Sequence, residues 1–233
     1  MPAAEPEQQR ARDHQRCLFL TFAAGWRWLD RPLPLGISLI AGALIKVQPA
    51  LLFAWALATR RRRAAAAGMA IGLVVAAAVT PLVGFTTWGD YVDLLRRVST
   101  PVTTPHNFTP GAIAFQLGAP ETVANLLQLA AFVTAVAVAA WAWLRSDAES
   151  AYVTTVVASQ LLSPLLWDHY AMLLLIPTAL LLERRHWWAV AIPLAGWLPA
   201  ATYPAAFIVC LIAPLVARSA TAAPRLAEGR QAA

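Results

Sequence analysis

The apolar run from Tyr152 to Leu182 is interrupted near its middle by the sequence SPLLWDHY, residues 163–170. The interruption places a proline, an acid and an imidazole in a stretch that otherwise reads as a membrane-embedded segment. Ionisable side chains at membrane depth are unfavourable unless they face a cavity or a partner. We therefore interpret residues 163–170 as the turn of a functional site.

A second interruption of the same form lies in the apolar run from Leu33 to Thr59, where Lys46 is followed by Gln48 and Pro49. Lys46 is the only lysine among the 18 Lys and Arg residues of the chain. Two interpretations are open: its ammonium group reaches the membrane surface from a helix end, or it lies near a cavity and pairs with a phosphate or carboxylate.

Composition places the chain among polytopic integral membrane proteins. Hydrophobic residues make up 59% of the chain and charged residues only 13%, compared with roughly 25% charged residues in soluble domains. The net charge of +6 does not indicate a nucleic-acid partner, because the arginines stand in short clusters between apolar runs. In such positions basic residues determine membrane topology.

The arginine clusters predict which segments cross the membrane. The positive-inside rule places residues 60–63, four consecutive arginines, in the cytosol. Ala64 to Gly84 is then long enough to cross outward, residues 85–121 form an outer loop, and Thr122 to Leu144 crosses back. We expect an all-α, polytopic transmembrane bundle.

Two of the apolar runs have arginines at both ends, so both of their ends are expected in the cytosol. Tyr152 to Leu182 offers only about 30 residues, whereas two full spans need roughly 40. Two half-length helices joined at residues 164–169 satisfy both conditions and form a re-entrant hairpin. The run from Leu33 to Thr59 predicts a second such hairpin with its turn at residues 46–49, and Trp187 to Ala217 a weaker third one.

We expect three parts in the chain: a disordered cytosolic tail at residues 1–16, a multi-helix transmembrane domain at 17–218 and a second disordered cytosolic tail at 219–233. The predicted location is the plasma membrane, with both termini cytosolic.

Candidate binding residues lie in the outer loop and in the second turn. An amphipathic helix is predicted around residues 90–98, with Arg96 and Arg97 facing lipid headgroups or a lipid-phosphate substrate. Asp168 and His169 are open to three interpretations: an outer surface turn without a role, a site for an anionic or sugar substrate, and a proton relay. Trp167, beside them, could form a stacking wall for a sugar.

The order of these features resembles glycosyltransferase family 87 of the GT-C superfamily, the polyprenol-phosphate-mannose-dependent mannosyltransferases. The resemblance rests on four pieces: the apolar run that ends in residues 45–49 (IKVQP), the arginines at 60–63, the outer-loop sequence HNF at 106–108 and the sequence SPLLWDHY at 163–170. It covers residues 27–218.

The resemblance implies transfer of a hexosyl or mannosyl unit from a polyprenyl-phosphate sugar donor to a lipid or glycan acceptor on the outer side of the membrane. It implies no cofactor, no metal and no nucleic-acid partner, and membrane lipids surround the chain. The expected substrate-binding residues are Lys46, Arg96, Arg97, His106, Asn107, Trp167, Asp168 and His169.

The acidic catalytic base of such enzymes lies in their first outer loop, and nothing here matches that loop. The chain resembles the C-terminal half of such an enzyme, which a truncated gene, a misplaced start or a split protein would explain, and we expect little activity from it alone. Asp90 and Asp93 are weak candidates for the base. The alternatives are a non-catalytic membrane subunit and a fragment of a secondary transporter, with Asp168 and His169 as its proton relay.

Overall fold

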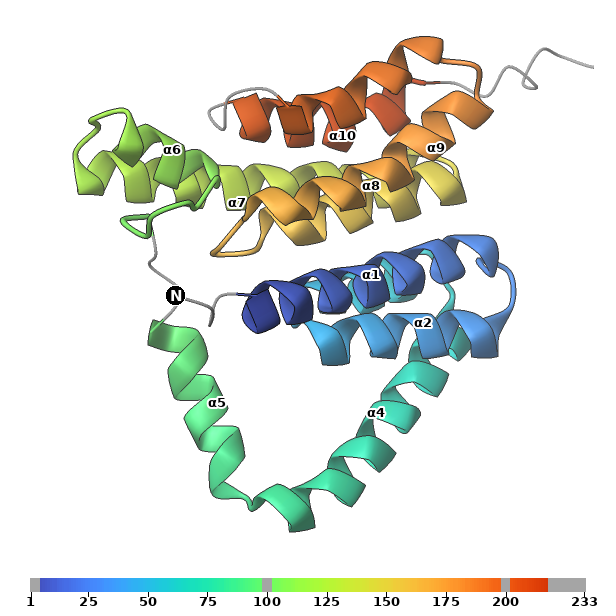
Figure 1. Ribbon diagram of the computed structural model, residues 1–233. Helices are drawn as coiled ribbons and strands as arrows, with labels where there is room; N and C mark the ends of the chain where they lie inside the picture. Colours follow the sequence, from blue (N-terminus) through green and yellow to red (C-terminus); the bar gives the residue numbers. More distant parts are fainter. Residues whose placement is uncertain (1–4, 98–101, 198–201, 218–233) are drawn as a thin grey trace, which may run out of the picture.

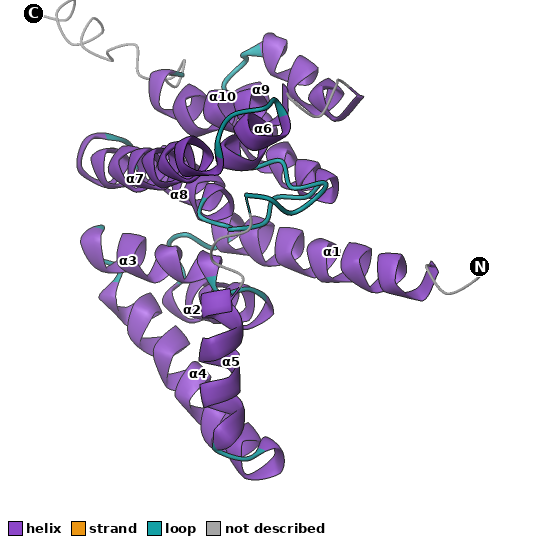
Figure 2. Cartoon of the chain, turned by 90° about the vertical axis from the view of Figure 1, so that its left-hand side faces the viewer, coloured by secondary structure: helices purple, strands orange, loops and turns teal. Residues whose placement is uncertain are grey.

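The computed structural model describes residues 5–97, 102–197 and 202–217, and over these residues the chain is helical with short connections (Figures 1 and 2). In chain order the elements are α1 (Glu5–Arg27), α2 (Pro32–Ile45), the 3-10 helix η1 (Gln48–Ala50), α3 (Leu51–Ala58), α4 (Arg62–Val83), α5 (Thr86–Arg97), α6 (Pro110–Gln116), α7 (Glu121–Arg145), α8 (Ala148–Leu161), the 3-10 helix η2 (Asp168–Leu174), α9 (Leu175–Glu183), the 3-10 helix η3 (Trp187–Trp197) and α10 (Tyr203–Val216).

Helix α8 is the centre of the bundle, because every residue from Ser150 to Leu161 is buried. Its small and hydroxylated side chains let neighbouring helices approach closely and bond to it, as is typical of helix contacts inside membranes. Trp143 of α7 donates to Thr155 at 2.7 Å, and the Tyr152 hydroxyl donates to the Phe22 carbonyl of α1 at 2.9 Å. Helices α7 and α1 are thereby joined to one core.

Two helices among the described residues are long and apolar enough to cross a membrane, α4 and α7. They match the spans predicted at Ala64–Gly84 and Thr122–Leu144 to within two residues at each end. Together with α5, α4 extends away from the rest of the molecule in both ribbon views (Figures 1 and 2). Its apolar side chains are largely exposed, with Leu82 84% exposed, which suits a surface that faces lipid.

The two interrupted runs fold as hairpins. In the first, α2 leads away and α3 returns, so that Asp30 before α2 and Arg61 after α3 form an ion pair at 3.2 Å. In the second, α8 leads away and α9 returns, and Asp147 and Arg184 pair at 2.8 Å. We call these paired ends the hairpin bases and the opposite ends the hairpin turns. Both bases lie to the right in Figure 1 and both turns to the left.

Helix α2 packs against α4 through two glycines near the first base. A Cβ on Gly36 would lie 2.6 Å from the Ala64 carbonyl oxygen and 2.9 Å from the Gly68 nitrogen. The backbones of the two helices are therefore in direct contact, which only residues without a side chain permit.

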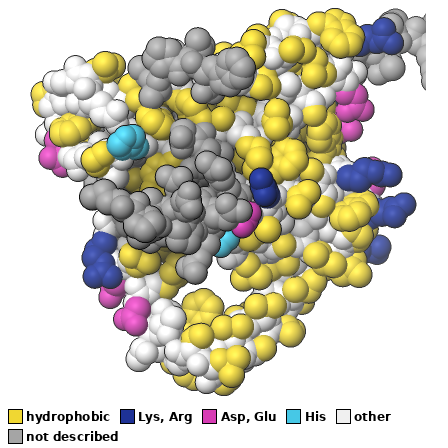
Figure 3. Space-filling view, in the orientation of Figure 1, with side chains coloured by type: hydrophobic (Ala, Val, Ile, Leu, Met, Phe, Trp, Pro, Cys, Tyr) yellow, Lys and Arg dark blue, Asp and Glu magenta, His cyan; other side chains and the backbone are white. Residues whose placement is uncertain are grey.

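The third predicted hairpin, Trp187 to Ala217, is represented by η3 and α10, whose connection lies outside the described residues. Its end returns to the second base, where Arg184 donates to the Ala217 carbonyl at 2.9 Å. Dark-blue basic groups gather along this right-hand edge of the molecule (Figure 3).

Residues 5–16, which the sequence assigned to a cytosolic tail, form the first half of α1 in this structure. The physical reason is a buried face: Gln15, Leu18 and Phe22 follow the helical spacing and are 6%, 2% and 1% exposed. Helix α1 runs from the turn end to the base end, so Glu5 and Ala217 lie at opposite ends of the bundle. The side of the membrane on which each terminus lies stays a prediction. The tail at 219–233 lies outside the described residues.

Candidate functional site

Lys46 lies at the turn of the first hairpin because α2 ends there. Its backbone is extended (φ −152°, ψ 141°), and its N–H donates to the Gly42 carbonyl at 3.0 Å. Pro49 has no N–H with which to continue the helix, and the chain resumes as a short 3-10 turn. The Lys46 side chain is thus free to leave the axis of α2.

The Lys46 ammonium group connects the two turns. It donates to the Ser163 hydroxyl at 3.0 Å and to the Tyr170 hydroxyl, and it lies 3.8 Å from the centre of the Tyr170 ring. Ser163 and Tyr170 bound the SPLLWDHY segment and are 1% and 9% exposed. The two interruptions that the sequence singled out therefore meet at one nitrogen atom.

A cavity of about 260 Å³ opens beside this contact. It is lined by His14, Gln15, Leu18, Ile45, Lys46, Trp167 and Tyr170. The Oε1 atom of Gln15 is buried there without a hydrogen-bond partner. The cavity combines an ammonium group, an amide, an imidazole and two aromatic rings, which is a set suited to an anionic group with an adjoining apolar or sugar part.

The electrostatic character of the cavity follows from the partners of Lys46. Among the side chains that the structure describes, no carboxylate forms an ion pair with it, and its partners are hydroxyl groups and a ring face. Hydroxyl groups do not neutralise a positive charge, so none of the described partners of Lys46 balances its charge.

Asn107, in the segment between α5 and α6, holds the second turn in place. Its Nδ2 donates to the Pro164 carbonyl at 3.0 Å, and its Oδ1 accepts from the backbone N–H groups of Leu166 at 3.0 Å and Thr109 at 3.2 Å. The Phe108 N–H adds a bond to the Leu166 carbonyl at 2.7 Å. Its side chain is fully buried and outside the cavity lining, so in this structure Asn107 positions the turn, and its contact with substrate stays a prediction.

The other predicted residues divide into two groups. Trp167, 40% exposed, lines the cavity next to Lys46. Asp168 and His169 begin η2 directly after it, and their side chains lie outside what the structure describes. His106 is exposed in the segment between α5 and α6, in a left-handed backbone conformation (φ 59°), and does not line the cavity.

The remaining predicted residues, Asp90, Asp93, Arg96 and Arg97, all lie on α5. The helix itself is as predicted, but none of its residues is buried. Arg96 and Asp93 form an exposed pair at 3.1 Å. None of the α5 residues lines the cavity, and α5 extends with α4 away from the rest of the bundle (Figure 1), so the structure does not bring these charges to Lys46.

Sequence reasoning missed His14 and Gln15, which it assigned to a disordered tail. A usable signal exists, because Gln15, Leu18 and Phe22 stand at the i, i+3, i+7 spacing of a buried helix face. No group of three His, Cys, Asp or Glu side chains that could hold a metal ion occurs among the described residues.

Long apolar helices around a polar site with a partly buried cation indicate a membrane protein. The comparison with protein families makes this class more specific. The model of glycosyltransferase family 87 matches residues 16–166. Since this is more than half of the 233 residues, the chain belongs to glycosyltransferase family 87, a family of membrane glycosyltransferases.

The matched range contains Lys46, Ser163 and Asn107 and ends at Leu166, inside the second turn. The resemblance inferred from the sequence covered residues 27–218, so the matched range ends earlier than expected at the C-terminal side. No curated protein and no solved structure matches the chain.

Proposed function

We propose that the chain acts in hexosyl transfer, with mannose as the expected sugar, from a polyprenyl-phosphate donor, and that the Lys46 cavity receives the phosphate of this donor. The carrying observation is the position of Lys46 between the two turns, with hydroxyl and aromatic partners and no described carboxylate. Family membership supplies the reaction class, and the cavity supplies the chemistry that the leaving group requires.

The departing lipid phosphate gains negative charge as the glycosidic bond breaks. A fixed ammonium group in a water-poor site stabilises such a charge more strongly than water does. Lysine suits this task because it presents a point charge to a phosphate oxygen. The Gln15 amide is the neutral group beside it, and rotation of this amide would offer its NH₂ to a second oxygen.

The size of the cavity argues for the phosphate rather than for a whole donor. Sites for drug-sized ligands range from roughly 300 to 1,000 Å³, whereas this cavity has about 260 Å³. A phosphate group and its first ester carbons fill such a volume. The sugar would then lie at the rim, where Trp167 offers an exposed ring face and Asp168 and His169 follow in sequence.

The membrane arrangement follows from helix length. Helix α2 has 14 residues and is about 21 Å long at 1.5 Å per residue, less than the roughly 30 Å of the hydrocarbon core. Arginines at the hairpin bases favour the cytosolic surface of the plasma membrane. The turns with Lys46 and Tyr170 would then lie at membrane depth, open to the outer side, as re-entrant hairpins of GT-C type.

The proposal is tested by binding of polyprenyl phosphate to the purified chain in nanodiscs. Lys46→Met is expected to weaken binding by about tenfold or more, as for the loss of a hydrogen bond to a charged group, and Lys46→Arg by less. Arg145→Met, which removes an exposed cation at the end of α7, is the matched control and should bind as the unmodified chain does.

Free polyprenol, which lacks the phosphate, separates charge recognition from recognition of the chain. It should bind equally to the unmodified chain and to Lys46→Met. Equal affinity of these two proteins for polyprenyl phosphate, with both folded by tryptophan fluorescence, would overturn the proposal.

A further inference from the structure

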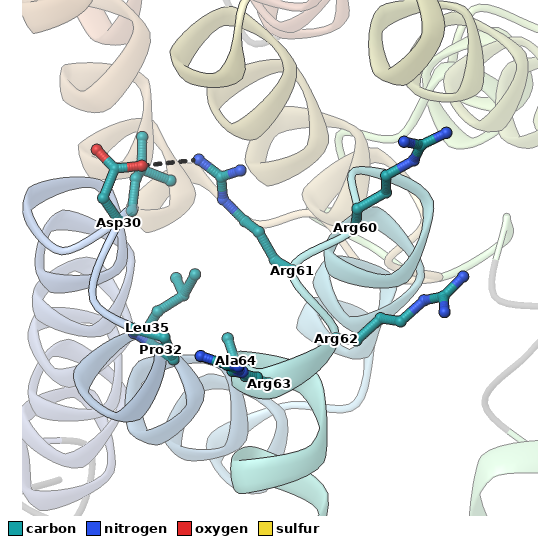
Figure 4. A pocket seen from close by; sticks show the side chains of 9 residues that line it. Asp30, Pro32, Leu35, Arg60, Arg61, Arg62, Arg63 and Ala64 are labelled. Carbon is teal, nitrogen blue, oxygen red and sulfur yellow. Dashed lines mark hydrogen bonds and ion pairs between the residues drawn. The ribbon is translucent and has the colours of Figure 1, made fainter.

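The four arginines at residues 60–63 surround a second cavity, at the base of the first hairpin. Its volume is about 380 Å³, and it is lined by Leu29, Asp30, Pro32, Leu35, Arg60, Arg61, Arg62, Arg63 and Ala64. Figure 4 shows the Arg61 and Arg63 side chains at the hollow between the α1–α2 connection and the start of α4, with Arg60 and Arg62 turned to the other side. The cavity is separate from the Lys46 cavity, with which it shares no lining residue.

The charge around this cavity is unbalanced. Asp30 is the only acid among the nine lining residues, against four arginines. Its side chain is 95% exposed, so its ion pair with Arg61 at 3.2 Å is screened by solvent. The Nε atom of Arg61 is buried without a hydrogen-bond partner, which leaves a donor unsatisfied inside the arginine cluster.

The position of the arginines adds a second observation. They stand at the N-terminus of α4, a helix of 22 residues without a side-chain cap, whose first backbone bond is the one from Ala64 to the Arg61 carbonyl at 3.0 Å. Cations are unfavourable at this end of a helix, and anions are favourable. A bound anion would satisfy the free N–H groups at the start of α4 together with the side chains of Arg61 and Arg63, which lie at the hollow (Figure 4).

Membrane topology alone accounts for the charge of this cluster but not for the cavity or the buried Nε. Arg61 is held in place by the face of Trp55, 5.3 Å from its guanidinium carbon, and its side chain is only 20% exposed. An arginine that served topology only would be expected to extend into solvent, as the exposed Arg145 does.

We propose that the cavity at Arg60–Arg63 binds a phosphate-type anion, supplied by the headgroup of an acidic phospholipid. Arginine presents planar pairs of N–H groups that match phosphate oxygens. Apolar residues line the other wall of the cavity, Leu29, Pro32 and Leu35, and Leu33 beside them is 58% exposed. A glycerol backbone and its acyl chains can continue along this apolar surface, whereas free phosphate gains nothing from it.

The test compares lipid retention by native mass spectrometry of the purified full chain, first reconstituted with phosphatidylglycerol or phosphatidylcholine. We expect retained phosphatidylglycerol and roughly tenfold less of it in Arg61→Gln/Arg63→Gln. The control Arg145→Gln/Arg185→Gln removes the same number of charges outside the cavity and should retain the lipid.

Asp30→Asn is expected to change lipid retention in the opposite direction. It keeps the site testable if the arginine variant fails to fold. It removes the only acid of the cavity, so retention of phosphatidylglycerol should increase. Inorganic phosphate is added in a separate arm: competition at millimolar concentration would identify free phosphate as the ligand and overturn the lipid assignment. Equal retention by the cavity variant and its control, or weaker retention by Asp30→Asn, would overturn the site itself.

Discussion

Arg184, at the base of the second hairpin, and Lys46, at the turn of the first, are both inserted between helices but have different partners. Arg184 is 7% exposed and bonds to Asp147 at 2.8 Å, to the Ser150 hydroxyl at 2.7 Å and to the Ala217 carbonyl at 2.9 Å. Lys46 has two hydroxyls and a ring face. Among the described residues, a carboxylate therefore balances the charge of Arg184 but not that of Lys46. We propose that Arg184 joins the helices at the base and that the charge of Lys46 serves a ligand.

The sharpest way to break this comparison is to remove each cation in turn. Arg184→Leu should lower the free energy of unfolding by about 3 kcal/mol, because it leaves buried partners in several segments unpaired. Lys46→Met should change it by less than about 1 kcal/mol, because a partly buried charge disappears together with two hydrogen bonds. Both are measured by denaturant titration in detergent. A loss at Lys46 as large as that at Arg184 would make Lys46 structural.

The second prediction concerns the turn end, where rigidity comes from Asn107 rather than from ion pairs. Asn107→Ala should lower the free energy of unfolding by about 2 kcal/mol, because buried backbone groups of Pro164 and Leu166 lose their partners. It should also weaken polyprenyl phosphate binding, since Ser163 and Tyr170 lose their fixed position. Thr103→Ala, an exposed neighbour in the same segment, is the control and should leave both measurements unchanged.

The positions of the turns and spans were predictable because their signals are local. Pro49 and Pro164 remove N–H groups within apolar runs, and the lengths of α4 and α7 are read directly from hydrophobic stretches. Arginines at both ends of a short run predicted that its ends meet, and Arg61 and Arg184 mark where they do. These inferences needed only the residues of one segment.

The composition of the site was predictable only in part, because it depends on contacts between distant segments. Nothing in the sequence shows that Asn107 bonds to Pro164, 57 residues away, or that Gln15 lies beside Lys46. Gln15 also stands in a polar stretch of mixed charge. In such a stretch, the few apolar residues that mark a buried helix face are difficult to recognise. The cavity at Arg60–Arg63 was not predicted, because membrane topology already explained why four arginines stand together there.

The third prediction tests whether the base end is held as much by close packing as by charge. Gly36→Ala should lower the free energy of unfolding by about 2 kcal/mol, because the new methyl group meets backbone atoms of α4 that cannot move aside. Gly89→Ala on α5 is the matched control: nothing lies within 4 Å of the point that the new methyl group would occupy, and the better helix propensity of alanine should be neutral or slightly stabilising. Equal effects would show that α2 and α4 are not in direct backbone contact.

The smallest expected effect is the pH dependence of the stability that the Asp147–Arg184 pair gives to the base. Burial alone would raise the pKa of Asp147, but hydrogen bonds from the backbone and side chain of Ser150 and the ion pair with Arg184 outweigh it, so the pKa lies below its ordinary value of 3.8. A carboxyl group with a lowered pKa in the folded state contributes stability that is fully present above the ordinary value and is lost as the pH falls through the lowered one. The side chain is 52% exposed, so solvent reduces this contribution to less than about 1 kcal/mol.

The measurement is the thermal unfolding midpoint of the chain and of Asp147→Asn between about pH 7 and about pH 3. The difference in midpoint between the two proteins should be largest near neutral pH and should shrink below about pH 4, where the native carboxylate takes up a proton. Asp93→Asn makes the same chemical change on exposed α5 and serves as the control. A difference that stays constant over the whole range would mean that the charge of Asp147 does not stabilise the base. Asp147 would then act only as the cap of α8, through the hydrogen bond from the Ser150 N–H at 2.9 Å, which asparagine retains. The charge of Arg184 would be neutralised by Glu149, at 3.6 Å.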